Sequence, residues 1–284
     1  MTVFAVKSDG ARQEFSEEKI IRTCLILGAT QKSAEYVANR IREQAYDGIR
    51  TDEILQMIFR ELEKTVPAVG YHIDLRTALS MMTPKPDFEW FAQALLREYG
   101  YDVDPSQIVM GKCVEHEVDA IARKEGRTYI VEAKHHFDHH ALTGLDVPRI
   151  ARATVEDLTD AFKEGKTRLQ VENAIVICNT KYSEHAMRYA ECRGIELIGW
   201  GYPQGRGIGR MIGEKMLYPT TYLKNLSAAQ RVRFSNNGIV LVKDIAGSNP
   251  RDLLRKTGLP ANLIDNIVRE AREVLQGTPS PEKI

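Results

Sequence analysis

Two β-type runs constrain the middle of this chain more than any other feature. Residues 128–134 are apolar and β-branched, as expected of a strand, and a short turn would pair them with the run 114–122. Side chains of a strand alternate between faces, so Glu132 and Lys134 are expected to project together. Asp119, thirteen residues before Glu132, lies in the first run. The pattern predicts that two carboxylates and an ammonium converge on one patch.

Such a patch suits the hydrolysis of a phosphodiester. Asp119 and Glu132 can hold a hard divalent cation, Mg²⁺ or Mn²⁺, through oxygen while leaving positions for water and a phosphate. The cation polarises the phosphoryl oxygen and acidifies a water, and Lys134 can orient that water or neutralise developing charge. The alternative is a solvated hairpin with an ordinary salt bridge, because this spacing of acids and lysine also arises by chance.

An alternation of helices and strands surrounds the two runs. The expected elements are a helix over 87–101, helices at about 146–164 and 183–193, and strands over 174–179 and 195–200. From Asp87 to about Ile198 the chain resembles the PD-(D/E)xK nuclease superfamily, and within it the restriction-endonuclease-like Mrr branch. The resemblance implies a mixed sheet flanked by helices, with DNA as the substrate.

The same resemblance implies a role for each polar residue of the patch. Asp119 and Glu132 correspond to the metal ligands, and Lys134 corresponds to the catalytic lysine. Glu89, in the first helix, matches an acid that often joins the site in this branch. Glu117 is expected on the strand face of Asp119, where it would be an auxiliary acid.

The N-terminal part, residues 1–84, is expected to form a short hairpin followed by helices. Strands at 3–7 and 13–15 flank a turn, and Ser16 is expected to cap the first helix. Thr51 is expected to cap a later helix, whose N-terminal amides would favour an anion. This part is predicted to be a small α+β domain.

The motifs of this part resemble an ATP-cone, the regulatory adenine-nucleotide domain of ribonucleotide reductases and of their transcriptional repressor. The matching segments, in the order of that family, are 6–10, 18–20, 46–54 and 71–78. The resemblance implies that Lys7 and Lys19 contact the phosphates of ATP or dATP and that Thr51 lies near the nucleotide. Ser8 departs from the family, which usually has a second base there, so one phosphate contact would be missing.

The C-terminal part is expected to be helical. Residues 250–272 are two helices joined by a turn at 257–260, and they resemble a degenerate helix-hairpin-helix, a module that offers backbone amides to DNA phosphates. Residues 220–284 carry 10 basic and 6 acidic side chains, a modest positive excess that suits phosphate contacts. A plain helical packing or dimerisation domain is the alternative.

Histidines, cysteines and hydropathy limit the remaining possibilities. Four of the seven histidines lie in residues 135–140, which favours a polar loop at the rim of the cleft over a second metal site. The four cysteines are scattered, which indicates reduced thiols in a cytoplasmic protein and neither a zinc site nor a disulfide framework. No run of about 18 apolar residues is present, so no membrane span is expected.

Together these patterns predict an α/β chain of three consecutive domains. They are an ATP-cone at 1–84, a nuclease domain at 85–205, and a linker with a small α-helical module at 206–284. The expected function is a metal-dependent DNA endonuclease controlled by ATP or dATP and assembled as a homo-oligomer, since cutting both strands of a duplex calls for two active sites. The alternative is a nucleotide-sensing, DNA-binding regulatory protein in which the nuclease fold only binds.

Overall fold

The computed structural model describes residues 3–8 and 10–277, and its chain forms two compact units. The first unit is discontinuous: it combines residues up to Ile73 with Tyr222–Gln230 and the residues from Val242 onward. The second unit comprises Asp74–Thr221 and Arg231–Leu241. This grouping differs from three consecutive domains, whose limits stay a prediction.

The N-terminal part of the first unit is a small sheet with helices. Its elements are β1 (Phe4–Val6), β2 (Arg12–Glu14), α1 (Glu17–Ile26), α2 (Gln31–Gln44), β3 (Ile49–Arg50), α3 (Thr51–Leu62) and a 3₁₀ turn, η1 (Pro67–Tyr71). β1 pairs antiparallel with β2 and parallel with β3. The helices share an apolar core that includes Ile20, Val37 and Ile58. The predicted hairpin and helices are thus present.

Two expected helix caps in this part have different outcomes. The side chain of Ser16 accepts a hydrogen bond from the amide of Lys19, which confirms it as the cap of α1. Thr51 is the first residue of α3 and is not its cap. The cap position belongs to Arg50, because the chain passes directly from β3 into α3 there, and Arg50 makes no capping hydrogen bond with its side chain.

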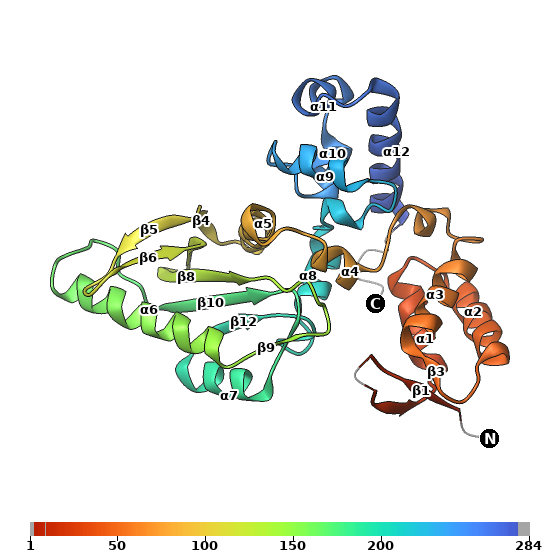
Figure 1. Ribbon diagram of the computed structural model, residues 1–284, viewed down its shortest axis with the longest axis horizontal. Coiled ribbons are helices and arrows are strands. Elements are labelled where there is room, and N and C mark those ends of the chain that lie inside the picture. Colours follow the sequence, from red (N-terminus) through yellow and green to blue (C-terminus); the bar gives the residue numbers. More distant parts are fainter. Residues whose placement is uncertain (1–2, 9, 278–284) are drawn as a thin grey trace. The chain divides into compact units, whose positions relative to one another are not determined.

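The second unit is built on a mixed five-stranded sheet (Figure 1). Its helices are α4 (Leu75–Ser80), α5 (Glu89–Glu98), α6 (Asp146–Lys163), α7 (Glu184–Arg193) and α8 (Ile208–Lys215), with irregular turns η2 (Pro84–Phe88) and η3 (Thr220–Tyr222). Its strands are β4 (Asp102–Asp104), β5 (Gln107–Met110), β6 (Glu115–Val118), β7 (Ala120–Lys124), β8 (Arg127–Lys134), β9 (Leu142–Thr143), β10 (Asn173–Cys178), β11 (Lys181–Tyr182) and β12 (Glu196–Ile198).

The sheet has the order β12-β10-β8-β7-β4. β12, β10 and β8 are parallel, whereas β8, β7 and β4 form an antiparallel meander. The helix-and-strand alternation after β8 is close to the predicted one. Two small ladders, β5 with β6 and β9 with β11, stand outside this sheet. The fold is therefore a mixed α/β arrangement, as predicted.

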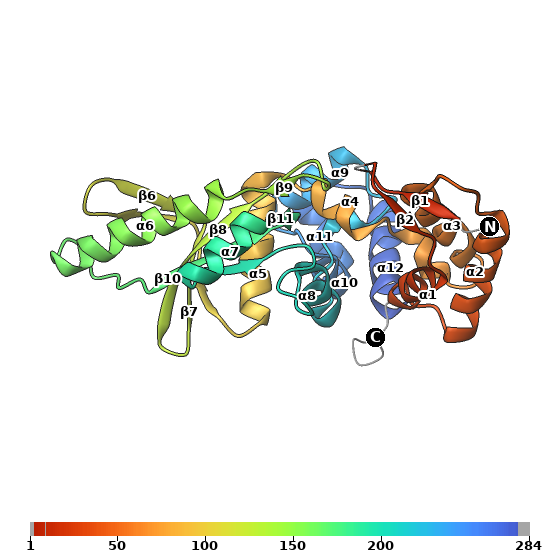
Figure 2. The same cartoon turned by 90° about the horizontal axis from the view of Figure 1, so that it is seen from below.

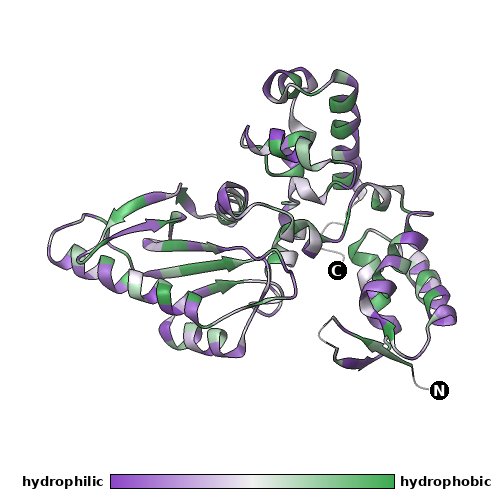
Figure 3. Ribbon diagram, viewed as in Figure 1, coloured by the Kyte–Doolittle hydropathy of each residue, from purple (hydrophilic) through white to green (hydrophobic). Residues whose placement is uncertain are grey.

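The core of this unit lies between the sheet and helices α6 and α7 (Figure 2); α6 packs on β10 and β8, and α7 packs on β12 and α6. α6 buries Val147, Ala151, Val155 and Leu158, whose spacing of three or four residues places them on one helical face. β10 is buried along almost its whole length, as expected of a central parallel strand, and it is coloured as hydrophobic in Figure 3. The carboxyl ends of β8 and β10 lie beside each other at the rim of this core.

The run 114–122 does not form one strand, which corrects the predicted hairpin. β6 pairs with β5, and only β7 pairs with β8 through the turn at Glu125 and Gly126. Asp119 is the residue between β6 and β7. The chain leaves one ladder and enters another there, so strand alternation does not carry across Asp119.

The C-terminal part contains four helices: α9 (Ala228–Ser235), α10 (Val242–Gly247), α11 (Pro250–Thr257) and α12 (Ala261–Gly277). Gly258 ends α11 in the left-handed conformation, and α12 packs on α10 and on η1. The amides of the turn are used internally: Gly258 N–H donates to Leu254 O, and Leu259 N–H donates to Thr257 Oγ1. This favours the helical-packing alternative over a turn that offers amides to phosphate.

The cysteines and the helices give two further findings. Cys24 and Cys178 are buried, Cys113 and Cys192 are exposed, and all four are free thiols. Within residues 3–8 and 10–277, no helix combines the length and the apolar character needed to cross a membrane.

Candidate active site

Asp119 is fixed by backbone contacts on both sides. Its amide donates to Val131 O at 3.1 Å, and its own carbonyl accepts from Gln93 Nε2 at 3.0 Å. The amide of Ala133 donates to Asp119 Oδ2 at 2.8 Å. The residue is only 8% exposed, so its carboxylate has a defined direction, with Oδ2 engaged and Oδ1 left for another partner.

Glu132 and Lys134 follow the expected strand alternation. Both belong to the continuous strand β8, with Ala133 between them on the opposite face. Burial raises the pKa of the Glu132 carboxyl, and the negative charge of Asp119 raises it further, while Lys134 offsets part of the effect. Asp119 and Lys134 therefore lie close enough to Glu132 for their charges to act on its carboxyl.

Glu89 joins this group from α5. It is 7% exposed and begins the helix, and Gln93, one turn later, is the residue that donates to the Asp119 carbonyl. Burial and the charge of Asp119 raise the pKa of Glu89. Two buried carboxyls oppose each other's ionisation, so a nearby positive charge is needed to stabilise the ionised forms of both Glu89 and Asp119.

Lys85 supplies part of that charge. Its Nζ lies 2.8 Å from Glu117 Oε1, 3.2 Å from Glu89 Oε1 and 3.8 Å from Asp119 Oδ1. The hydrogen bond to Glu117 is the main reason why the pKa of Lys85 is raised. Glu117 therefore approaches the site through Lys85 from the separate ladder of β5 and β6. Its carboxylate and that of Asp119 both face Lys85 Nζ, although the chain changes ladders between the two residues.

A divalent cation fits the donor set. Glu89, Asp119 and Glu132 offer carboxylate oxygens, the ligands that Mg²⁺ and Mn²⁺ prefer. Glu89 Oε1 is buried and lies 3.2 Å from Lys85 Nζ, and Asp119 Oδ1 lies 3.8 Å from the same ammonium. As the side chains stand, no three acidic, histidine or cysteine groups among residues 3–8 and 10–277 are gathered closely enough to hold a metal ion, and Lys85 lies among the carboxylates instead.

The histidine run packs into the protein instead of forming a second donor cluster. His135 contacts Phe88 and Phe137 edge-on, and its Nε2 lies 3.0 Å from Leu79 O. The Nε2 of His136 lies 3.0 Å from Thr143 Oγ1. Burial lowers the pKa of both imidazoles, so both favour the neutral form.

A buried amide holds the chain just beyond Lys134. Asn179 Oδ1 accepts from the His136 amide and Asn179 Nδ2 donates to the His136 carbonyl, both at 2.8 Å. Asn179 is fully buried and directly follows β10, whose last residue pairs with Lys134. The Asn179 side chain therefore continues the hydrogen bonding between β8 and β10 beyond the last backbone pair, and it fixes the path of the backbone after Lys134.

The three candidate nucleotide contacts lie around the small sheet of the first unit: Lys7 follows β1, Lys19 is in α1 and Thr51 begins α3. Val6 and Arg50 are partners at the ends of the parallel strands β1 and β3. The residues that follow them, Lys7 and Thr51, therefore lie next to each other at the end of that strand pair. Lys19 Nζ donates to Gln13 Oε1 of β2 at 3.2 Å. The structure thus arranges these residues around one small sheet.

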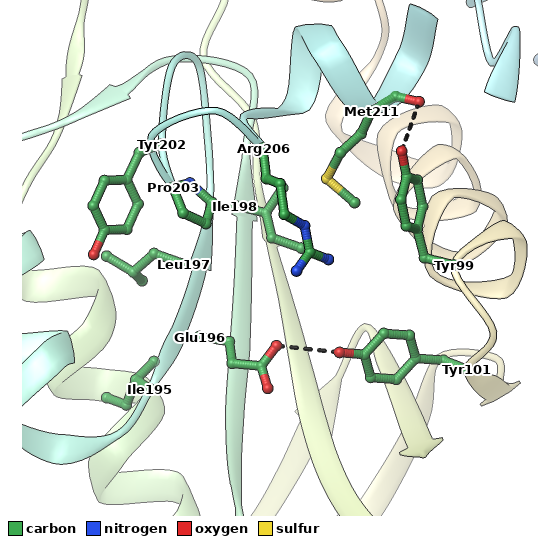
Figure 4. Close-up of a pocket in the computed structure, with 10 residues that line it drawn as sticks. All are labelled: Tyr99, Tyr101, Ile195, Glu196, Leu197, Ile198, Tyr202, Pro203, Arg206 and Met211. Carbon is green, nitrogen blue, oxygen red and sulfur yellow. Dashed lines mark hydrogen bonds between the residues drawn. The ribbon is translucent and has the colours of Figure 1, made fainter. Parts of the chain in front are cut away.

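A separate hollow of about 200 Å³ lies beside strand β12 (Figure 4). Tyr101 Oη donates to Glu196 Oε2 at 3.2 Å. Tyr99 Oη donates to Glu214 Oε2 at 2.7 Å and also lies 3.3 Å from the Met211 carbonyl oxygen. The guanidinium of Arg206 extends into the space between these groups (Figure 4). None of its lining residues belongs to the carboxylate group, so it is a different feature of the same unit.

Comparison with known proteins agrees with this geometry. Residues 79–200 match a family described as restriction endonuclease, and residues 218–275 match one described as AF1548-like, C-terminal. An uncharacterized protein of Archaeoglobus fulgidus is 34% identical over 181 residues, which are 64% of this chain and 98% of that protein. The chain belongs to the AF1548-like family.

Two further relatives of this AF1548-like chain carry no established function. A second uncharacterized protein of Archaeoglobus fulgidus is 53% identical over 36 residues, or 13% of this chain and 77% of that protein. A crystal structure described as AF1548, a protein of unknown function, has a TM-score of 0.57 and 32% identity, and the match covers 66% of this chain and 99% of that one. The matched endonuclease family includes every residue of the carboxylate group.

Sequence reasoning did not assign roles to Gln93 and Lys85, which contact the group, or to Asn179, which holds the backbone beyond Lys134. Gln93 lies four residues after Glu89, so helical periodicity could have placed it on the same face. Asn179 ends a predicted strand beside Lys134, and its polar side chain at a strand end was a usable signal. Lys85 had no such signal, because its contacts depend on how the turn before α5 folds back.

Proposed function

We propose that this AF1548-like protein is a metal-dependent endodeoxyribonuclease that hydrolyses phosphodiester bonds. The observation that carries the proposal is the convergence of Asp119, Glu132 and Lys134, with Glu89 beside them, within residues that match the restriction endonuclease family. A fold that only bound DNA would gain nothing from buried carboxylates that repel both each other and phosphate.

Asp119 and Glu132 would hold the cation, and Glu89 is close enough to Asp119 to serve as an additional carboxylate ligand. The amide of Ala133 and the side chain of Gln93 orient Asp119 before any ligand arrives, so little ordering is left for the binding step. When bound, a divalent cation supplies Lewis acidity toward the phosphoryl oxygen and makes a water more acidic. The same cation would relieve the repulsion between the carboxyls.

Lys134 would act on the reacting phosphate and water. It shares the face of Glu132, and the Asn179 clamp on the following backbone fixes where its strand ends. An ammonium at this position can orient the attacking water and neutralise charge that develops on the phosphoryl oxygens. Glu117 would take part through Lys85.

Plasmid cleavage tests the proposal. Supercoiled DNA is incubated with the full chain and Mg²⁺, Mn²⁺ or EDTA, and nicked and linear products are resolved on a gel. Cleavage with either metal and none with EDTA is expected. Purified protein that leaves DNA intact with both metals, but binds it, would support the regulatory alternative.

The first unit is proposed to bind ATP or dATP at its hairpin. The resemblance of its motifs to an ATP-cone and the grouping of Lys7, Lys19 and Thr51 around one sheet support this. Calorimetry with each nucleotide tests it, and a flat titration at millimolar concentration refutes it.

A homo-oligomer is proposed because one site of this kind accommodates one scissile strand. Nucleotide would change assembly or cleavage only if it bound one state better than another. Light scattering with and without nucleotide, paired with the plasmid assay, measures both.

A further inference from the structure

Two carboxylate oxygens of the site face the same ammonium. Asp119 Oδ2 is engaged by the Ala133 amide, which leaves Oδ1, and Lys85 Nζ lies 3.8 Å from that atom. Glu89 Oε1 is buried, and Lys85 Nζ lies 3.2 Å from it. Lys85 therefore approaches one oxygen of each carboxylate, Asp119 Oδ1 and Glu89 Oε1, that a cation at this position would use.

Lys85 also has an outer partner. Its closest contact is Glu117 Oε1 at 2.8 Å. The Lys85 and Glu117 side chains are 56% and 62% exposed, whereas that of Glu89 is 9% exposed. The ammonium is thus shared between an inner pair of carboxylates and one solvent-exposed carboxylate, and it can keep the outer contact while leaving the inner pair.

We propose that Lys85 regulates metal binding at this site: its ammonium holds the cation position at Asp119 and Glu89 until a divalent cation displaces it toward Glu117. The inference rests on the proposed metal-dependent function. A divalent cation approaches its oxygen ligands to about 2.0–2.6 Å, much closer than Nζ lies. Two cations cannot share the same pair of oxygens without strong repulsion, so one must leave.

This role makes opposite predictions for two side chains. Without the ammonium, the metal has no competitor, so Lys85→Met should bind metal more tightly. Without the outer carboxylate, Lys85 has only Asp119 and Glu89 as partners, so Glu117→Gln should bind metal more weakly. An ordinary structural ion pair predicts weaker binding in Lys85→Met, because the carboxyls would lose the charge that holds them together.

Calorimetric titration of the full chain with MnCl₂ at pH 8 measures these effects without relying on catalysis. We expect the Kd of Lys85→Met to fall roughly fivefold, since half-exposed ion pairs are worth up to about 1 kcal/mol, and that of Glu117→Gln to rise by a smaller factor, roughly threefold. Lys85→Arg keeps the charge and should stay close to the unaltered protein.

Two matched controls remove charge elsewhere in the same unit. Lys163→Met deletes an exposed lysine that pairs with Asp160, and Glu156→Gln deletes a carboxylate that is 59% exposed and pairs with Arg152. Both should leave the Kd unchanged.

An unchanged or higher Kd in Lys85→Met, or an unchanged or lower Kd in Glu117→Gln, overturns the proposal for Lys85 but not the proposed metal site. If the unaltered protein takes up no Mn²⁺, the proposed metal site is itself wrong, and the inference falls with it.

Discussion

Removing the buried amide of Asn179 should loosen the chain beyond Lys134 at a measurable cost. Asn179→Ala deletes both 2.8 Å hydrogen bonds to the backbone of His136. Asn179 is fully buried, so water does not readily replace its amide. Each buried polar group left without a partner costs about 1–3 kcal/mol, and His136 is only half-buried, so we expect a loss of about 2–4 kcal/mol in the free energy of unfolding.

Urea unfolding followed by circular dichroism gives that free energy, and hydrogen exchange at the His136 amide reports the local opening directly. Asn237→Ala is the matched control, because Asn237 is exposed and its side chain donates to Arg233 O at 2.8 Å. It should cost less than about 1 kcal/mol. If Asn179→Ala lowers the free energy of unfolding by less than its control does, and the His136 amide stays protected from exchange, the two hydrogen bonds from Asn179 do not stabilise the protein.

Three further predictions concern other parts of the chain. Asp157 lies 2.8 Å from His116 Nε2 and accepts from the Cys113 amide at 2.9 Å, and these contacts, the first above all, lower its pKa to about 2. The ionised Asp157 should stabilise the turn between β5 and β6 fully above its ordinary pKa of 3.8, and this stabilisation should disappear as the pH falls toward 2. Hydrogen exchange at the Cys113 amide can follow the loss, and Asp157→Asn should remove the pH dependence of that exchange. Lys134→Ala should lower the cleavage rate by roughly 10²–10³ while leaving the Kd for Mn²⁺ near its original value, as kinetics paired with calorimetry can establish. Lys19→Ala should weaken ATP binding several-fold in calorimetry, and an unchanged Kd would place the nucleotide elsewhere.

Strong periodic patterns predicted the central fold well. The apolar, β-branched residues 128–134 form the end of β8, and the helical spacing of apolar residues predicted α6 to within about one residue. Because a continuous strand fixes alternation, Glu132 and Lys134 could be placed on one face from sequence alone. The fold was therefore predictable where local pattern and tertiary structure agree.

The break at Asp119 could not be predicted in the same way. No glycine or proline interrupts residues 114–122, and the run keeps its β-type composition through both ladders. Only the pairing of β6 with β5 shows that the chain changes partners. The position of Lys85 is likewise a tertiary property, because its three carboxylate contacts come from α5, β6 and the residue before β7.

Glu132→Gln tests the central claim most directly, because it separates activity from stability. Burial and Asp119 both disfavour the charged Glu132 carboxyl, so an uncharged side chain of the same shape should leave the protein as stable as before or more stable. Plasmid cleavage with Mn²⁺ should nevertheless fall by at least about 10²-fold, since a proposed ligand is lost. Undiminished cleavage by a folded Glu132→Gln protein would contradict the assignment of this site.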